Sequence, residues 1–571
     1  MSESEHRGTS RRRLLQTGAA AAAAGAVFGG SKAVASPGGH GESPAGDLIL
    51  SGGEIHTQDA HNSVVDVVAI RQGEIVYVGH SEGSAQRQFK DKPRSINLRG
   101  RTAVPGIIDC HNHIVLMGNR PGHHTPLENA YSIADVQATI RARAGGVKAG
   151  EFITTIGGFH FNQFTEARLP TLAELDAAAP NHPVYVSIGF TGPSATNTLG
   201  KQFFDAVGGS FPVTVGADGS IAAGTPTTSA TLALRQQLTF EQRKQSVRDA
   251  MAYAVSLGVT THLDQGAFQA TNTPADGAAH EDNYKMHLPF LSVFADGDGV
   301  VRLRINFLHM DADPDSQPLS QRLLNAFPFF GNDLVRTGGI GEFVAPDPTD
   351  PIGSGTANNV RWLTAATKVA QAGWRAEVHS LTPTDFKAEI DGFALVDAQY
   401  PIRNLRWVVA HASAITEDYV NKLKALGGGI NLTGFRYFAG TPTAAGPPYR
   451  MLLDNGIPIG MSSDGMQIAP MNPWVHAYYA TTGKNALGTL INGAQLATRQ
   501  EMVAHYTRAN GWFLGGEDEQ KLGTLEVGRL GDVAVLNQPY FDLRRVPDTA
   551  LRQTRSVLTV LGGSVVYNAL R

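Results

Sequence analysis

Short apolar runs separated by polar turns occupy both ends of the chain. Leu48–Leu50, Val64–Ile70 and Ile75–Val78 are each followed by glycine-containing turns, and runs at 532–536, 556–560 and 564–567 repeat this texture near the other end. Runs of this length bounded by turn residues predict β-strands. Because either group alone has too few strands to bury a face, we expect residues 47–104 and 520–571 to combine in one β-sandwich.

The segment between these ends, residues 105–519, has a different pattern. Apolar runs alternate there with helix-like stretches, of which we single out Phe240–Leu257, Asn358–Ala372, Thr416–Leu426 and Arg499–Thr507. This alternation predicts an α/β fold with a parallel sheet or a (β/α)8 TIM-type barrel. The length of the segment leaves room for insertions between the barrel units.

Composition narrows the function classes. The chain has 571 residues, which suffices for one large catalytic domain and a smaller one. Its 47 Lys+Arg against 51 Asp+Glu give a net charge of -4, and no basic tract of five or more residues is present, so we expect no nucleic-acid partner. Cys110 is the single cysteine, which excludes an internal disulfide and cysteine-based zinc clusters. Any metal must therefore be held by histidines and carboxylates.

The first residues read as an export signal. Arg11-Arg12-Arg13-Leu14-Leu15 resembles a twin-arginine motif, an alanine-rich run 17–30 follows it, and Ala33-Val34-Ala35 is a small-residue cleavage site. We expect residues 1–35 to be a removable signal peptide that engages the twin-arginine export machinery, and 36–46 to be a linker. A disordered tail or an uncleaved anchor is the alternative. The mature protein should be periplasmic or secreted, and no later segment has the ~20 continuous apolar residues that a membrane span needs.

Histidines and one aspartate stand where apolar runs end. His111 and His113 follow the run 105–109, and side chains at positions i and i+2 of a strand point to the same side. His379, His411 and Asp464 each end a further short apolar run. In a barrel, the carboxyl ends of the strands meet at the active-site face. These residues therefore predict a shared metal site.

Several further motifs resemble the amidohydrolase superfamily, most closely amidohydrolase family 3, which includes N-substituted formamide deformylases. These motifs are residues 164–171, 179–184, 257–262 and 523–529 with Asp532. The resemblance implies a metal-dependent barrel with a flanking β-sandwich, with His111, His113, His379 and His411 as metal ligands. It makes Asp464 the last ligand and the base that accepts a water proton and returns it to the leaving nitrogen. Zinc is the default divalent ion for these donors, and manganese, iron or cobalt fit as well.

The sequence departs from the family pattern at two places. Many two-metal members carry a carboxylated lysine after the fourth strand, but residues 335–343 contain none. Glu342 is the candidate replacement, either as a bridging ligand or as the residue that handles the leaving group; a surface or structural glutamate is the alternative. The number of ions, one or two, stays open. His379 is also followed by Ser380 rather than by the usual Gly-Asp.

Five other residues are candidates for substrate contact. We name His262, His160, Asn162 and Trp474 as substrate-binding candidates, with structural roles as the alternatives, and Lys484 as a weaker anchor for an anionic group. The predicted function is hydrolysis of an amide, formamide or cyclic amide C–N bond of a small molecule by metal-activated water. A metal-dependent decarboxylase or isomerase on the same fold, or a non-catalytic periplasmic binding protein, are the alternatives. The substrate stays open, as does a homo-oligomeric state.

Overall fold

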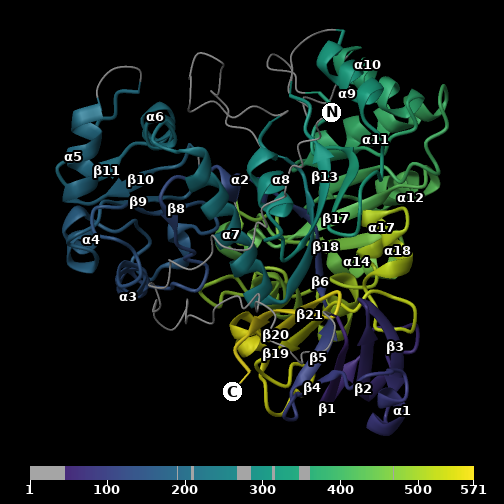
Figure 1. The fold of residues 1–571 in the computed structure, drawn as a ribbon. Helices are drawn as coiled ribbons and strands as arrows, with labels where there is room; N and C mark the ends of the chain where they lie inside the picture. Colours follow the sequence, from purple (N-terminus) through teal and green to yellow (C-terminus); the bar gives the residue numbers. More distant parts are fainter. Residues whose placement is uncertain are drawn as a thin grey trace, which may run out of the picture.

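The computed structural model describes residues 46–189, 191–207, 211–266, 285–310, 315–345, 360–466 and 469–570. The predicted signal peptide and, except for Gly46, the predicted linker lie outside this part. Figure 1 shows three regions: a central α/β body, a β-rich region at the bottom of the view and a smaller α/β region at the left.

Parallel strands form the centre of the molecule. One four-stranded sheet has the order β14-β13-β12-β6 and a second the order β15-β16-β17-β18. These strands are β6 (Ile107–Asn112), β12 (Val259–Asp264), β13 (Arg302–Phe307), β14 (Val335–Ile340), β15 (Glu377–Ser380), β16 (Val408–His411), β17 (Gly429–Thr433) and β18 (Ile459–Ser462). The two sheets meet at both edges: Ile340 and Ala376 form a parallel bridge, and the Asp464 amide donates to the His111 carbonyl oxygen at 3.0 Å.

Helices separate these strands, so the predicted strand–helix alternation is confirmed. They are α7 (Phe240–Leu257), α8 (Leu288–Ala295), α9 (Gln317–Asn325), α10 (Val360–Gln371), α11 (Pro383–Asp397), α12 (Glu417–Ala425), α13 (Arg436–Ala439), α14 (Tyr449–Asn455), α15 (Pro473–Thr482) and α16 (Arg499–His505). α7 has the bounds predicted from its pattern. Thr239 and Gln242 form a capping box at its start, and Gly258, with φ +87°, ends it in a left-handed conformation.

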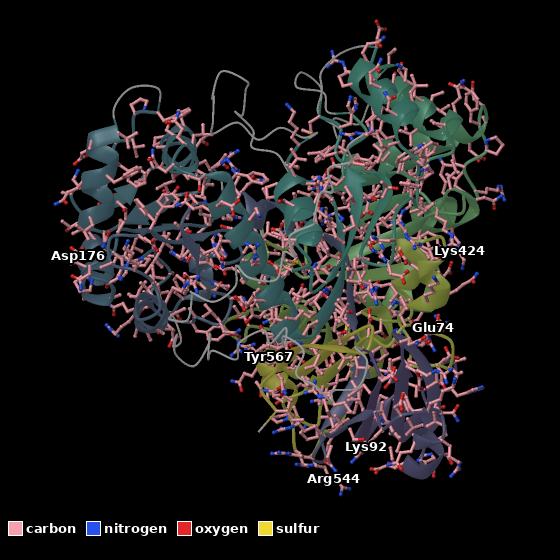
Figure 2. The ribbon with its side chains drawn as sticks, in the orientation of Figure 1. Glu74, Lys92, Asp176, Lys424, Arg544 and Tyr567 are labelled. Atoms are coloured by element: carbon pink, nitrogen blue, oxygen red, sulfur yellow. The ribbon has the colours of Figure 1, made fainter. Side chains whose placement is uncertain are left out.

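Strands from both ends of the chain pair in one eight-stranded sheet. The link is β5 against β19, which run antiparallel. The strands are β1 (Leu48–His56), β2 (Val64–Arg71), β3 (Glu74–Gly79), β4 (Arg94–Asn97), β5 (Thr102–Pro105), β19 (Val533–Leu536), β20 (Ser556–Leu561) and β21 (Ser564–Asn568), with α1 (Glu82–Gln86) beside them. A core that includes Leu50, Val68 and Val535 fills one face. Figure 2 shows the exposed residues Lys92 and Arg544 at the lower edge of the molecule, beside this sheet.

The first predicted strand is longer than expected. The sequence suggests a stop at Gly52-Gly53, but β1 continues to His56 and its pairing with β2 shifts between Ser51 and Ile55. A β-bulge or similar irregularity lets the strand continue through the two glycines with a changed pairing register.

A separate five-stranded sheet lies in the region at the left of Figure 1. It contains β7 (His123–His124), β8 (Ile153–Ile156), β9 (Val184–Ser187), β10 (Ser194–Thr196) and β11 (Ser220–Ile221), with α3 (Ile133–Ala144), η1 (Phe161–Gln163), α4 (Leu172–Ala178), α5 (Thr198–Val207) and α6 (Thr225–Arg235). It is inserted between β6 and β12, after the short helix α2 (Val115–Gly118).

Three short helices complete the C-terminal part: α17 (Gly511–Leu514), α18 (Asp518–Lys521) and η3 (Asp548–Gln553). None of the helices in the described part of the chain combines the length and apolarity that a membrane crossing requires.

Candidate metal centre

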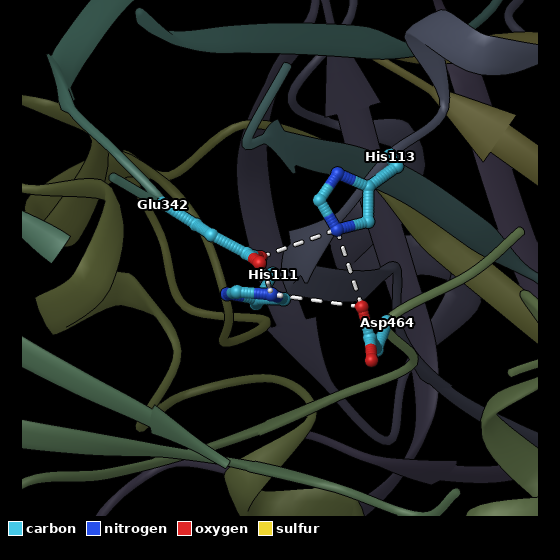
Figure 3. A group of neighbouring side chains, drawn as sticks. All are labelled: His111, His113, Glu342 and Asp464. Atoms are coloured by element: carbon cyan, nitrogen blue, oxygen red, sulfur yellow. Dashed lines mark ion pairs between the residues drawn. The ribbon is translucent and has the colours of Figure 1, made fainter. Parts of the chain in front are cut away.

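Four side chains converge at the carboxyl ends of the parallel strands. His111 lies in β6 and His113 just after it, while Glu342 follows β14 and Asp464 follows β18. Their potential ligand atoms lie within 4.8 Å of one another. The Glu342 Oε2 atom is 2.9 Å from His111 Nε2 and 3.2 Å from His113 Nε2, and Asp464 Oδ1 is 3.2 Å from His113 Nε2 (Figure 3). The predicted strand-end residues are thus brought together.

A second group shares Glu342 with the first. The other Glu342 oxygen, Oε1, is 2.6 Å from His379 Nδ1, and His379 Nδ1 is 3.0 Å from His411 Nε2. Glu342 therefore presents one carboxylate oxygen to each group. Its side chain is buried, which excludes the alternative of a surface glutamate. This is the arrangement expected of a bridging carboxylate.

The polar atoms of the first group fit a bound cation. His111 Nε2, Glu342 Oε2 and Asp464 Oδ2 are buried and lie in ion-pair contacts, but none of them has a partner with hydrogen-bond geometry. A buried polar atom without such a partner costs about 1–3 kcal/mol. A divalent ion removes this cost, because histidine nitrogens and carboxylate oxygens are its usual protein ligands.

The charges in the cluster also favour a cation. Burial raises the pKa of Glu342, but His379 and His113 outweigh it and hold that pKa well below the ordinary value. Burial likewise raises the pKa of Asp464, but His411 and His113 outweigh it and hold that pKa below its ordinary value. Both carboxylates are thus ionised at neutral pH. Burial lowers the pKa of His411 to about 3, so this imidazole is neutral and can act as a ligand.

A buried carboxylate that the sequence did not single out supports His111. Glu377 Oε1 lies 2.6 Å from His111 Nδ1 and accepts a hydrogen bond from Asn431 Nδ2 at 2.6 Å, while its Oε2 accepts one from Gln265 Nε2 at 3.0 Å. A carboxylate at Nδ1 holds the proton there and leaves the Nε2 lone pair for a metal. The only sequence feature that could have indicated this role is that Glu377 is a charged residue inside the apolar run 376–378.

Carbonyl and hydroxyl oxygens orient two of the other histidines. His113 Nδ1 donates to the Gly266 carbonyl oxygen at 2.5 Å, and His411 Nδ1 is 3.1 Å from Thr433 Oγ1. His379 is the most exposed of the histidines in the two groups, with 25% of its side chain accessible, and Phe343 stacks on its ring at 5.3 Å. The cluster therefore opens on the side of His379.

Two of the predicted substrate-contact residues are buried and lie outside the two ligand groups. Trp474 is buried, its Nε1 donates to the Leu257 carbonyl oxygen at 2.9 Å, and its ring lies 5.3 Å from that of Tyr540. His262 is fully buried in β12, and neither ring nitrogen has a hydrogen-bond partner among the described residues. The structure places neither of them in the ligand groups. The contacts of Trp474 favour its structural alternative, whereas His262 lacks the hydrogen bonds of a structural histidine among the described residues.

The other two candidates lie on a segment that approaches the cluster. His160 accepts a hydrogen bond from the Asn162 amide at 3.0 Å at the start of η1, and η1 contacts α13, which follows β17. A Cβ atom on Gly158 would lie 3.0 Å from Met466, two residues after Asp464. This part of the insertion therefore reaches the loops that follow the last two parallel strands.

Comparison with known proteins identifies the family. The model of the amidohydrolase family Amidohydro_3 matches residues 94–567. The chain belongs to this family, and the predicted resemblance is confirmed.

Individual relatives match only in part. N-substituted formamide deformylase of Arthrobacter pascens is 29% identical over 162 residues, which is 27% of this chain and 29% of that protein. Protein LONG AFTER FAR-RED 3 of Arabidopsis thaliana is 28% identical over 243 residues, 39% of this chain and 40% of that protein. The matched region thus spans less than half of either relative.

Solved structures share the fold over most of the chain. An uncharacterized metal-dependent hydrolase of Pyrococcus horikoshii OT3 has a TM-score of 0.58 at 16% identity, covering 87% of this chain and 98% of that one. Atrazine chlorohydrolase TrzN of Arthrobacter aurescens TC1, complexed with zinc, has a TM-score of 0.51 at 17% identity, covering 92% and 96%. At these identities the likeness shows the fold alone, and the family and these neighbours imply a TIM-type barrel.

Proposed function

We propose that this protein is a metal-dependent hydrolase that cleaves the C–N bond of a small amide, formamide or cyclic amide. The observation that carries the proposal is the position of Glu342 between two groups of ligands, His111, His113 and Asp464 on one side and His379 and His411 on the other. Membership of the amidohydrolase family and the partial match to an N-substituted formamide deformylase support it.

The residues of the cluster have distinct parts in this chemistry. A divalent ion, zinc by default, lowers the pKa of water toward ~7 and polarises a carbonyl oxygen when bound. The histidines and Glu342 would hold it. Asp464 is ionised, so its carboxylate can accept a proton from the attacking water. Asp464 then returns the proton to the leaving nitrogen, as a general acid.

We propose two ions per chain, because Glu342 offers one oxygen to each group. Elemental mass spectrometry on protein purified without added metal or chelator tests this. The expected content is two equivalents in the unaltered protein and fewer in Glu342→Gln, with a His111→Ala/His113→Ala variant as the control for loss of the first group. One equivalent in the unaltered protein would refute the bridge.

Product analysis tests the reaction. A panel of N-formyl, N-acyl and cyclic amides is incubated with the protein, and the released amine and carboxylate are quantified. Release of CO₂ without amine would instead indicate the decarboxylase alternative, and rearrangement without water uptake the isomerase. A metal-free protein that binds small molecules without turnover would indicate the binding-protein alternative.

Two finer features of architecture and location belong to the same proposal. We propose that the eight parallel strands close into a barrel and that the sheet built from both chain ends is its flanking sandwich. We also propose export by the twin-arginine route to the periplasm or the medium, based on Arg11-Arg12-Arg13 and the alanine-rich run. A variant with Arg11, Arg12 and Arg13 all changed to lysine should remain in the cytoplasm on cell fractionation.

A further inference from the structure

A half-buried arginine lies next to the cluster at the carboxyl end of β17. Arg436 is the first residue of α13, directly after Phe435. The Phe435 ring lies 6.2 Å from the His411 imidazole, edge to face, and the Arg436 guanidinium carbon lies 4.8 Å from the Phe435 ring centroid. The Arg436 guanidinium and the His411 imidazole therefore contact the same phenylalanine ring.

Arg436 lacks the acidic partner that three buried arginines of this protein have. Arg302 and Arg304 are paired with Asp532 and Asp518 at 2.7 and 2.5 Å, and Arg499 with Asp548 at 2.7 Å. Within the described ranges Arg436 forms no ion pair, and its buried Nε atom has no hydrogen-bond partner. The titratable neighbour that acts on it is the Tyr479 phenol, whose own hydroxyl donates to the Gly446 carbonyl oxygen.

Removing a guanidinium from water without an anionic partner costs free energy, so this arrangement suits a site that an anion completes. The planar fork of a guanidinium matches a carboxylate, which it binds through two parallel hydrogen bonds. Two aromatic rings lie beside the nearby histidines, because Phe435 contacts His411 and Phe343 stacks on His379. These rings favour an aromatic or aliphatic spacer between the ligand cluster and the arginine.

We propose that Arg436 binds a carboxylate of the substrate, and that the substrate is an N-acyl or N-formyl compound in which an apolar spacer joins this carboxylate to the scissile C–N bond. This inference rests on the proposed function for the identity of the bond that is cleaved. The carboxylate contact itself concerns binding alone, so it can be tested without turnover.

The first experiment is calorimetric titration of the metal-loaded protein with 3-phenylpropionate and with its neutral counterpart, 3-phenylpropanamide. We expect Arg436→Met to weaken phenylpropionate binding at least tenfold and to change phenylpropanamide binding less than twofold, because a hydrogen-bonded charge pair is lost for the first ligand only. Arg436→Lys should retain part of the affinity. Lys92→Met is the control, since it removes an exposed cation at the lower edge of the molecule, and should leave both affinities unchanged.

Three results would overturn the inference: undetectable phenylpropionate binding by the unaltered protein, equal phenylpropionate affinity in Arg436→Met, or an equal loss for both ligands. Carboxylate binding to the metals themselves is common to all the variants and so cancels in the comparison. Metal content, measured on each variant, should not change.

Kinetics separate this inference from the proposed function. With 4-(formamidomethyl)benzoate, in which a benzene ring separates the carboxylate from the formamide, and with N-formylbenzylamine, which lacks the carboxylate, Arg436→Met should raise KM at least tenfold for the first substrate and leave the second unchanged. If neither compound nor any other amide is hydrolysed while phenylpropionate binding still depends on Arg436, the proposed function fails and the anion site stands. If amides are hydrolysed and Arg436→Met has no selective effect, the reverse holds.

Discussion

Replacing Glu377 by glutamine should weaken metal binding although Glu377 contacts no ion. The side chain keeps its shape, but one carboxylate oxygen becomes an NH₂ group. Each oxygen of Glu377 faces at least one donor: Oε1 faces His111 Nδ1 and Asn431 Nδ2, and Oε2 faces Gln265 Nε2. Whichever way the amide is turned, a donor meets a donor.

The magnitude follows from the contacts that are lost. A hydrogen bond to a charged group contributes about 1.5–3 kcal/mol, and loss of such a partner of a ligand histidine typically lowers metal affinity 10- to 100-fold. Arg375 Nη2, 3.6 Å from Glu377 Oε2, would also face a neutral group. We therefore expect the dissociation constant of the ion held by His111 to rise 10- to 100-fold, as measured by competition with a chromophoric chelator.

Glu389→Gln is the matched control for this prediction. Glu389 is buried in α11, and burial raises its pKa well above the ordinary value, so the same substitution there replaces a carboxyl group whose neutral form burial favours. Its metal affinity should equal that of the unaltered protein. If Glu377→Gln kept full affinity while circular dichroism showed an unchanged fold, Glu377 would not orient His111 and the reasoning would be refuted.

Three further outcomes follow from the structure. Asp464→Asn should lower kcat on a confirmed substrate about 10²- to 10⁴-fold, since the amide cannot accept the water proton; unchanged turnover would remove Asp464 from that role. Cys110 is fully buried and burial raises the pKa of its thiol well above the ordinary value, so iodoacetamide should label it only in denaturant, as mass spectrometry would show. Burial lowers the pKa of His476 to about 3, so between pH 6.5 and pH 3 this residue is protonated in the unfolded chain but not in the native state. Urea titrations should therefore show a free energy of unfolding about 2 kcal/mol lower at pH 5 than at pH 7 from this residue. The His476→Gln variant should lose that difference.

Elements bounded by clear capping or turn residues could be predicted from the sequence, and the short strands of the insertion could not. Helix α7 and the strands β2, β3 and β20 lie within a residue or so of their predicted bounds, because capping or turn residues mark their ends. The insertion sheet was not predicted. Its strands have two to four residues, as in β7 and β10, and pairing partners far away in the chain fix such strands rather than any local pattern.

The ligand residues were predictable because a strand end is a local signal, but their supporting network was not. His111 and His379 each close an apolar run that is visible in the sequence. The partners of Glu377, in contrast, are Gln265 and Asn431, which come from two other strands, and no spacing rule connects them. Buried hydrogen-bond networks of this kind follow from the three-dimensional arrangement of the strands alone.

The glycines before Glu342 explain how its short side chain reaches both ligand groups. A Cβ atom on Gly339 would lie 2.7 Å from the Arg375 carbonyl oxygen, and one on Gly341 would lie 2.9 Å from the Glu377 Cβ. Their lack of a side chain lets the end of β14 approach β15 closely, since any larger residue would push the strands apart. Glu342 thereby starts close enough to His379 to contact it with one oxygen while the other reaches His111 and His113. The glycine-rich run that made Glu342 look like a surface residue in the sequence is thus what brings its carboxylate into the centre.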